Sequence, residues 1–173
     1  MEKRPLLVWI NGAHGAGKSS VARALAKLLG GGPILDPEQI GFMLRRFMAL
    51  PADFKDDPIW RTLTVETLAA ASGRSGVAIV PMTLDDGRYR EEIVGGLAGR
   101  GIDVRHFTLL ATPRTLRRRL LSRCDWPGST RWALRRIERS VAELEKPEYA
   151  VHVRTDGRRI VQIASEIGAM VQG

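Results

Sequence analysis

A glycine-rich segment near the N-terminus carries the clearest chemistry in the sequence. Residues 12–19 read Gly-Ala-His-Gly-Ala-Gly-Lys-Ser, the full pattern of a P-loop. In this pattern backbone N–H groups point at phosphate oxygens, the lysine reaches the β and γ phosphates, and the serine hydroxyl binds Mg²⁺. The segment therefore predicts a site for ATP and Mg²⁺, with Lys18 catalytic and Ser19 at the metal. The expected nucleotide-binding residues are Gly12, Ala13, His14, Gly15, Ala16, Gly17, Lys18, Ser19 and Ser20.

The segments on either side of this loop are of the kind that a P-loop needs. Residues 6–10 form a continuous apolar run, which predicts a buried strand. Residues 19–29 carry apolar side chains at helical spacing, so the loop leads into a helix N-terminus whose partial positive charge favours phosphate. No Asn-Lys-x-Asp segment for reading guanine follows. The early position of the loop then favours a kinase over a GTPase.

Apolar bursts alternate with helical patterns along the whole chain, which predicts an α/β fold with a parallel sheet. Strands are expected at residues 6–10, 34–35, 77–80, 104–110 and 150–154. Helices are expected at residues 19–29, 59–72, 89–98, 113–123, 131–145 and 158–170, with a further one ending at residue 48. No linker divides the chain, so residues 1–173 are expected to form one domain.

Asp36 follows the predicted second strand. In parallel α/β folds the ligand lies outside the carboxyl ends of the strands, so Asp36 is expected to face both the P-loop and the acceptor. We assign it as general base for the acceptor hydroxyl, with a contact to Mg²⁺ through water. Asp36-Pro37-Glu38-Gln39 is also a good helix start, with Asp at the N-cap and Pro at the first position. The two roles are compatible.

Other polar side chains are candidates for the acceptor site and for a lid over the phosphates. The acceptor candidates are Arg45, Trp60, Arg61 and Thr83, for which the alternatives are a solvated helix face, core packing or a loop cap. Two arginine-rich helices flank a Pro-Gly pair at residues 127–128, and guanidinium groups suit phosphoryl charge. Arg119, Arg123 and Arg139 are therefore expected to act in catalysis, a solvated basic face being the alternative.

Composition limits the possible partners and compartments. No run approaches the 18 apolar residues of a membrane span, and a single cysteine suits a reducing compartment, so a cytoplasmic location is expected. The chain has 27 Lys and Arg against 19 Asp and Glu, a net charge of +8. Positive charge attracts polyanions, either nucleic acids or nucleoside phosphates. The P-loop favours the small polyanion, so no nucleic-acid partner is expected.

An ordered series of short segments from about residue 7 to 168 resembles the tunicamycin-resistance proteins. The P-loop alone is common to many protein classes, whereas this series is specific. It includes Trp9-Ile10-Asn11-Gly12-Ala13, Asp36-Pro37-Glu38, Leu44-Arg45, Trp60-Arg61, Ile79-Val80-Pro81-Met82-Thr83, His106-Phe107-Thr108-Leu109, Thr115-Leu116 with Arg119 and Arg123, Trp132-Ala133, and Thr155-Asp156.

The resemblance implies a P-loop nucleoside- or nucleotide-kinase-like, three-layer fold with a five-stranded parallel sheet and a helical lid, here at about residues 124–131. It further implies phosphorylation of tunicamycin, or of a related nucleoside-like antibiotic, and so resistance to the drug. Members of that family extend further with a C-terminal amphipathic segment linked to membrane attachment. This sequence ends at Gly173, so stable membrane attachment is not expected.

Three other functions stay open at this point. The first is a housekeeping kinase for a nucleotide or sugar, and the second is an ATP-binding protein that sequesters the drug without transfer. The third is a nucleic-acid-binding protein, which the net charge of +8 suggests and which predicts binding with a steep salt dependence.

Overall fold

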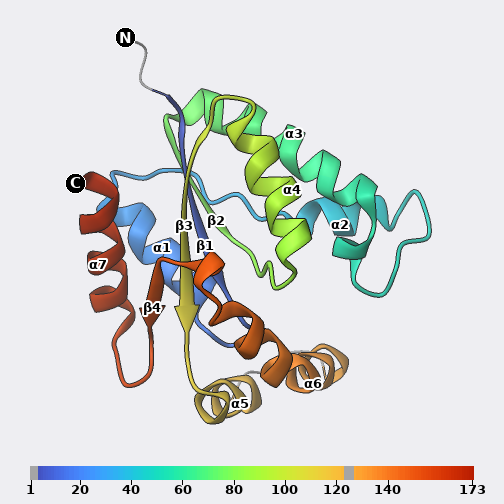
Figure 1. Ribbon diagram of the computed structural model, residues 1–173, viewed down its shortest axis with the longest axis vertical. Helices are drawn as coiled ribbons and strands as arrows, with labels where there is room; N and C mark the ends of the chain where they lie inside the picture. Colours follow the sequence, from blue (N-terminus) through green and yellow to red (C-terminus); the bar gives the residue numbers. More distant parts are fainter. Residues whose placement is uncertain (1–3, 123–126) are drawn as a thin grey trace.

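A parallel sheet runs through the middle of the protein (Figure 1). The computed structural model describes residues 4–122 and 127–173. Within this part of the chain the sheet has four strands, in the order β2-β1-β3-β4: β1 (Leu6–Gly12), β2 (Val77–Pro81), β3 (Asp103–Leu110) and β4 (His152–Arg154). Every neighbouring pair is parallel, and Leu6 lies opposite both Val77 and Asp103. β1 is therefore an inner strand, and the P-loop leaves from its carboxyl end.

Helices cover both faces of the sheet because the strands are apolar on both sides. Successive side chains of a strand point to opposite faces. Leu7 and Trp9 are fully buried in one core with α3 (Pro58–Ser75) and α4 (Gly87–Ala98). Val8 and Ile10 are fully buried in the other core with α1 (Lys18–Leu28) and α7 (Ile160–Gln172). The predicted α/β layers with helices on both faces are confirmed.

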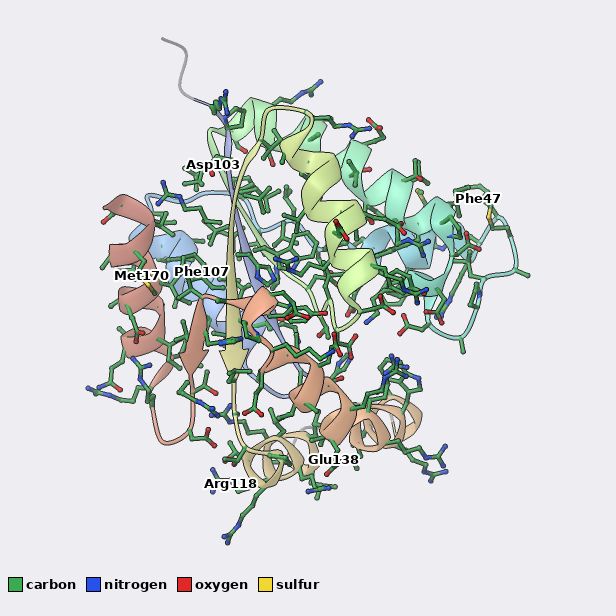
Figure 2. The ribbon with its side chains drawn as sticks, viewed as in Figure 1. Phe47, Asp103, Phe107, Arg118, Glu138 and Met170 are labelled. Carbon is green, nitrogen blue, oxygen red and sulfur yellow. The ribbon has the colours of Figure 1, made fainter. Side chains whose placement is uncertain are left out.

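The second core also holds the two arginine-rich helices, α5 (Pro113–Leu121) and α6 (Pro127–Leu144). Their apolar sides contribute Leu116 and Ile137, both fully buried. Phe107 of β3 belongs to the same core, and Met170 of α7 packs against it (Figure 2). The outer sides of α5 and α6 are joined by an ion pair between Arg117 and Glu138. Two basic helices are thus held beside the carboxyl end of the sheet.

The prediction of five strands is wrong for the residues that the structure describes. Residues 34–35 form only a bridge between Ile34 and Ile79, with Leu35 N donating to Ile79 O at 2.8 Å and Ile79 N donating to Pro33 O at 2.9 Å. The segment is too short to continue pairing, because it lies between a glycine-rich turn and Pro37, the N-cap of the next helix. It still follows the edge of β2, which places Asp36 at the carboxyl end of the sheet.

The remaining boundaries differ from the sequence prediction mainly at residues 44–58 and around the start of α6. The helix expected to reach residue 48 is α2 (Glu38–Leu44), and the following loop contains the short 3₁₀ helix η1 (Phe54–Asp56). A second 3₁₀ helix, η2 (Pro147–Tyr149), precedes β4. The expected lid loop at residues 124–131 is partly helical, because α6 already begins at Pro127; residues 123–126, and with them Arg123, lie outside the described residues. Among the described helices, none is long and apolar enough to cross a membrane.

Candidate active site

The P-loop has the backbone shape that its glycines predict. Gly12 has φ 145°, and a Cβ atom there would come within 2.8 Å of the carbonyl oxygen of Leu109. Gly17 has φ 102° and directly precedes α1, which begins at Lys18. The N–H groups in the first turn of a helix have no intrahelical acceptor. The loop thus brings a set of backbone donors and a helix N-terminus to one place, which suits phosphate.

Side-chain hydrogen bonds hold the P-loop together and join it to the segment that follows β2. Lys18 Nζ donates to the carbonyl oxygens of Gly12 at 2.9 Å and Ala13 at 3.1 Å. Thr83 Oγ1, after β2, donates to the same Gly12 oxygen at 2.8 Å. The fully buried Asn11 accepts from the N–H of Gly12 at 2.8 Å and from that of Leu84 at 2.9 Å. Movement of the loop after β2 is therefore tied to the P-loop.

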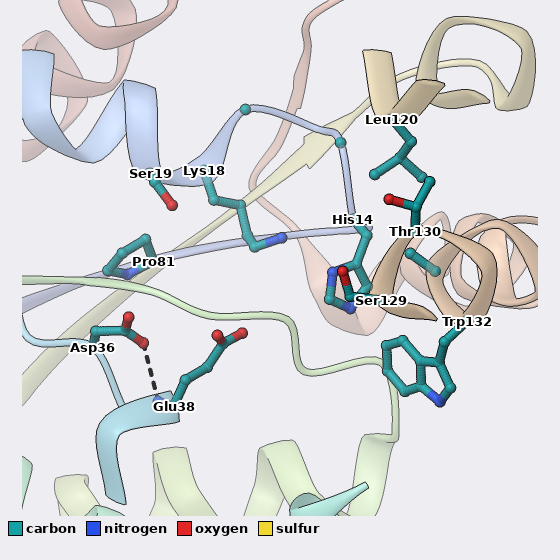
Figure 3. A pocket seen from close by; sticks show the side chains of 13 residues that line it. His14, Lys18, Ser19, Asp36, Glu38, Pro81, Leu120, Ser129, Thr130 and Trp132 are labelled. Atoms are coloured by element: carbon teal, nitrogen blue, oxygen red, sulfur yellow. Dashed lines mark hydrogen bonds between the residues drawn. The ribbon is translucent and has the colours of Figure 1, made fainter. Parts of the chain in front are cut away.

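A cavity of about 330 Å³ lies over the P-loop (Figure 3). The loop and the helix start form one wall, the residues at the start of α2 form the second, and α5 and α6 form the third. Its lining residues are His14, Gly15, Gly17, Lys18, Ser19, Asp36, Glu38, Pro81, Leu120, Ser129, Thr130, Trp132 and Ala133. Most of the predicted P-loop residues meet here, whereas Ser20 lines a separate apolar groove on the outer side of α1.

A second cavity, of about 290 Å³, adjoins the first. The two share four residues: His14, Glu38, Ser129 and Trp132. The other lining residues of the second cavity are Phe42, Arg45, Ala52, Asp53, Phe54, Lys55, Met82 and Thr83. Its aromatic and apolar side chains, next to a phosphate site, suit an acceptor with a ring or other apolar portion.

Glu38 is a site residue that the sequence analysis missed. It lines both cavities, and its side chain points into the space between the P-loop and Trp132 (Figure 3). Burial, and then the nearby carboxylate of Asp36, raise the pKa of Glu38. Asp36 itself is exposed, and its Oδ1 accepts from the N–H of Glu38 at 3.0 Å. The sequence signal that could have identified Glu38 is a second carboxylate two residues after Asp36, in the first turn of the following helix.

The predicted acceptor residues fall into two groups. Thr83 and Arg45 line the second cavity, and Arg45 also donates to the carbonyl oxygen of Ala52 at 2.8 Å. Trp60 is fully buried and lines neither cavity, so the expected substrate contact is corrected to core packing; its Nε1 donates to Pro37 O at 3.1 Å and so supports the start of α2. Arg61 is only 9% exposed and lines neither of them.

Arg61 lies behind the second cavity and contacts residues next to it, instead of lining the cavity itself. Its Nη1 donates to the carbonyl oxygen of Lys55 at 2.6 Å, and its Nε pairs with Glu92 at 2.5 Å. Its guanidinium carbon lies 4.3 Å from the centre of the Tyr89 ring. The sequence analysis expected Arg61 either to contact the acceptor or to lie on a solvated helix face, and its burial is neither, because a helical pattern does not tell which neighbour an arginine meets.

The predicted lid arginines Arg119 and Arg139 also lie at different places in the structure. Arg119 reaches the P-loop, where its Nη1 lies 3.3 Å from the carbonyl oxygen of Ala16, and its Nη2 donates to Thr155 O at 2.9 Å. Arg139 lines a small cavity of about 90 Å³ together with Asp85 and Arg136, and it lines neither of the two larger cavities. In this structure Arg139 therefore does not line the P-loop cavity, where the phosphate contact was expected, and lies instead at this small charged cavity.

His14 stands between the two cavities as a neutral side chain. Its ring meets that of Trp132 edge to face, with ring centres 5.2 Å apart. Burial, followed by repulsion from Lys18, lowers the pKa of His14 from 6.5 to about 3. The imidazole is therefore neutral near pH 7 and adds no positive charge to the P-loop.

Replacement of His14 should change how stability depends on pH. Because its pKa is lower folded than unfolded, unfolding takes up a proton, and stability is lost as pH falls below 6.5. In urea unfolding, the free energy of unfolding of His14→Gln should therefore fall less between pH 7 and pH 5 than that of the parent, by up to about 2 kcal/mol. The buried carboxylates are common to both proteins and cancel in the difference. Identical pH dependence in the two proteins would contradict a buried neutral His14.

Comparison with known proteins agrees with this geometry. A family model described as an AAA domain matches residues 7–147, and a comparison with curated proteins found no match. A gluconokinase from Sinorhizobium meliloti 1021 has a TM-score of 0.64 at 19% identity, with 99% of this chain and 98% of that chain covered. The APS kinase of Mycobacterium tuberculosis, solved with AMPPNP and APS, has a TM-score of 0.67 at 19% identity, covering 98% and 99%. These two show the P-loop kinase-like fold.

A third similarity is much stronger. The tunicamycin resistance protein of Deinococcus radiodurans is 30% identical, with a TM-score of 0.81, over 97% of this chain and 96% of that chain. The resemblance found in the sequence is thereby confirmed along nearly the whole length. The chain therefore belongs to the tunicamycin-resistance protein family, and it has a P-loop kinase-like fold.

Proposed function

We propose that the protein transfers the γ-phosphoryl group of ATP to a hydroxyl of tunicamycin or a related nucleoside-like acceptor. The observation that carries this proposal is the pair of adjoining cavities. One is built on the P-loop, and the other is walled by Phe42, Phe54, Met82 and Trp132. Glu38 and His14 stand where the two meet. A phosphoryl donor and an alcohol held in them would have their reacting atoms beside Glu38.

The residues divide the work between positioning and charge stabilisation, as in other phosphoryl transfers. The P-loop and Lys18 hold the β and γ phosphates, and Arg119 supports the loop from outside. Glu38 accepts the proton of the acceptor hydroxyl while the oxygen of that hydroxyl bonds to the γ phosphorus. The bond from that phosphorus to the β–γ bridging oxygen breaks, and ADP leaves. The raised pKa of Glu38 makes its carboxylate a better base than an ordinary one.

Asp36 takes a different part from the one first assigned to it. Its carboxylate already accepts a hydrogen bond from Glu38 N–H, and so it orients the first turn of α2. It lines the P-loop cavity together with the hydroxyl-bearing Ser19. In this proposal Asp36 positions Glu38 and faces the metal, while Glu38 handles the proton.

The oxygen donors of the P-loop cavity fit Mg²⁺. Ser19 and Asp36 supply a hydroxyl and a carboxylate, and among the described residues no group of three or more His, Cys, Asp or Glu could hold a metal alone. Mg²⁺ is typically bound by one or two carboxylates together with substrate phosphates and water. When bound, the ion supplies neutralisation of phosphate charge.

The test is incubation of the protein with ATP, Mg²⁺ and tunicamycin, followed by mass spectrometry of the drug. We expect a product heavier by one phosphoryl group and an equal amount of ADP. Drug that is bound but unchanged would contradict transfer and favour sequestration. Unmodified and unbound drug, with transfer to a simple nucleotide or sugar instead, would favour a housekeeping kinase.

A further inference from the structure

The helix α6 lines both cavities with Ser129 and Trp132. Trp132 lines the P-loop cavity and the acceptor cavity, and its ring packs on His14 of the P-loop. The guanidinium carbon of Arg136, one turn further along α6, lies 4.6 Å from the centre of the Trp132 ring. Such stacking holds a guanidinium in a fixed orientation.

Arg136 also reaches the wall of the acceptor cavity. Its Nη2 lies 3.3 Å from Oδ2 of Asp53, whose side chain is only 8% exposed. The other oxygen of Asp53 accepts from the N–H of Lys55 at 3.2 Å and so begins η1. A continuous set of contacts therefore leads from His14 through Trp132, Arg136 and Asp53 to the acceptor wall.

A second tie between α6 and the acceptor wall ends at the same lysine. Ser140 donates to Oδ2 of Asp85. Oδ1 of Asp85 lies 3.2 Å from Nζ of Lys55, and Asp53 lies 3.6 Å from it. Burial raises the pKa of Asp85, but Lys55 and the hydrogen bond from Ser140 outweigh it and lower the pKa to about 2. Two carboxylates thus hold the buried Lys55 and are each bound to α6.

We infer that Arg136 is a positioning residue that couples nucleotide binding at the P-loop to the order of the acceptor wall, residues 52–57. Separating the buried Asp53 from Arg136 would remove one of the two cations, Arg136 and Lys55, that lie against its carboxylate, which is costly. Through these buried contacts, η1 moves together with α6 when nucleotide binds. This inference rests on the proposed function only in requiring that the P-loop bind nucleotide.

The test is amide hydrogen exchange with and without AMPPNP and Mg²⁺, in the parent, in Arg136→Gln and in Arg135→Gln. Arg135 is the matched control, since it is an exposed arginine on the same helix. In the parent and in Arg135→Gln, AMPPNP should slow exchange both at residues 12–20 and at residues 52–57. Coupling between two sites typically changes the affinity at one of them by about 5-fold or more. In Arg136→Gln the slowing at 12–20 should persist, and that at 52–57 should be clearly smaller than in the parent, since the tie through Ser140 and Asp85 remains.

A second variant and two contrary outcomes distinguish coupling from a purely structural role of Arg136. Asp53→Asn keeps an oxygen for Lys55 N–H but loses the charge that meets Arg136, so it should reproduce the effect of Arg136→Gln, and the double variant should add nothing further. Two results would overturn the coupling alone. The first is slowing at 52–57 in Arg136→Gln equal to that in the parent, and the second is no slowing at 52–57 in the parent despite slowing at 12–20. No slowing at 12–20 in the parent would refute nucleotide binding, and both proposals with it.

Discussion

Lys18→Ala should nearly abolish phosphoryl transfer while leaving the fold intact. Lys18 lines the P-loop cavity, and its Nζ lies at the Gly12 and Ala13 carbonyls, where it would meet the β and γ phosphates. Removing one fixed donor to developing charge typically costs about 10² to 10³ in kcat. The lysine is not part of either core, so the free energy of unfolding should change little. The measurements are ADP formation with tunicamycin and urea unfolding.

Lys27→Ala is the matched control for this variant. Lys27 is an exposed lysine at the other end of the same helix, α1, and its loss removes the same charge from the protein without touching the cavity. It should keep the parent rate. A Lys18→Ala protein that is folded and turns over at the parent rate would remove the P-loop from the mechanism.

Glu38→Gln should lower turnover by about 10² to 10⁴, the usual worth of general acid–base catalysis. Glutamine keeps the size of the side chain at the junction of the two cavities, but it cannot take a proton from the acceptor hydroxyl. The free energy of unfolding should be unchanged or should rise, because the carboxylate is partly buried and its burial raises its pKa. The measurement is kcat for transfer at saturating ATP.

Asp36→Asn separates the two carboxylates. Asparagine caps a helix about as well as aspartate, so the hydrogen bond from Glu38 N–H should be kept and α2 should stay in place. We expect a smaller loss of kcat than in Glu38→Gln, together with a higher Mg²⁺ requirement. The opposite order, with parent-like transfer in Glu38→Gln and a large loss in Asp36→Asn, would return the proton to Asp36 and refute our assignment.

The sequence determined the features that are local along the chain. The P-loop needs only a strand, a run of glycines with Lys18 and Ser19, and a helix start, and these are consecutive residues. The layers followed from apolar runs and helical spacing, which decide whether an element is buried on one side or on both. Asp36 was placed correctly at the edge of the P-loop cavity because ligands of parallel sheets lie at the carboxyl ends of the strands.

Only the tertiary structure decided what each isolated charged or aromatic side chain meets. Periodicity gives the face of a helix but not the element packed against it. Trp60 and Arg61 therefore looked like acceptor contacts, although one is a core residue and the other braces Lys55. Arg136 was overlooked because its partner, Asp53, lies in a loop far away in the sequence. The edge segment at residues 34–35 was likewise too short for sequence to show that only one bridge would form. Long-range pairing depends on the packed fold as a whole, and no local pattern of residues encodes it.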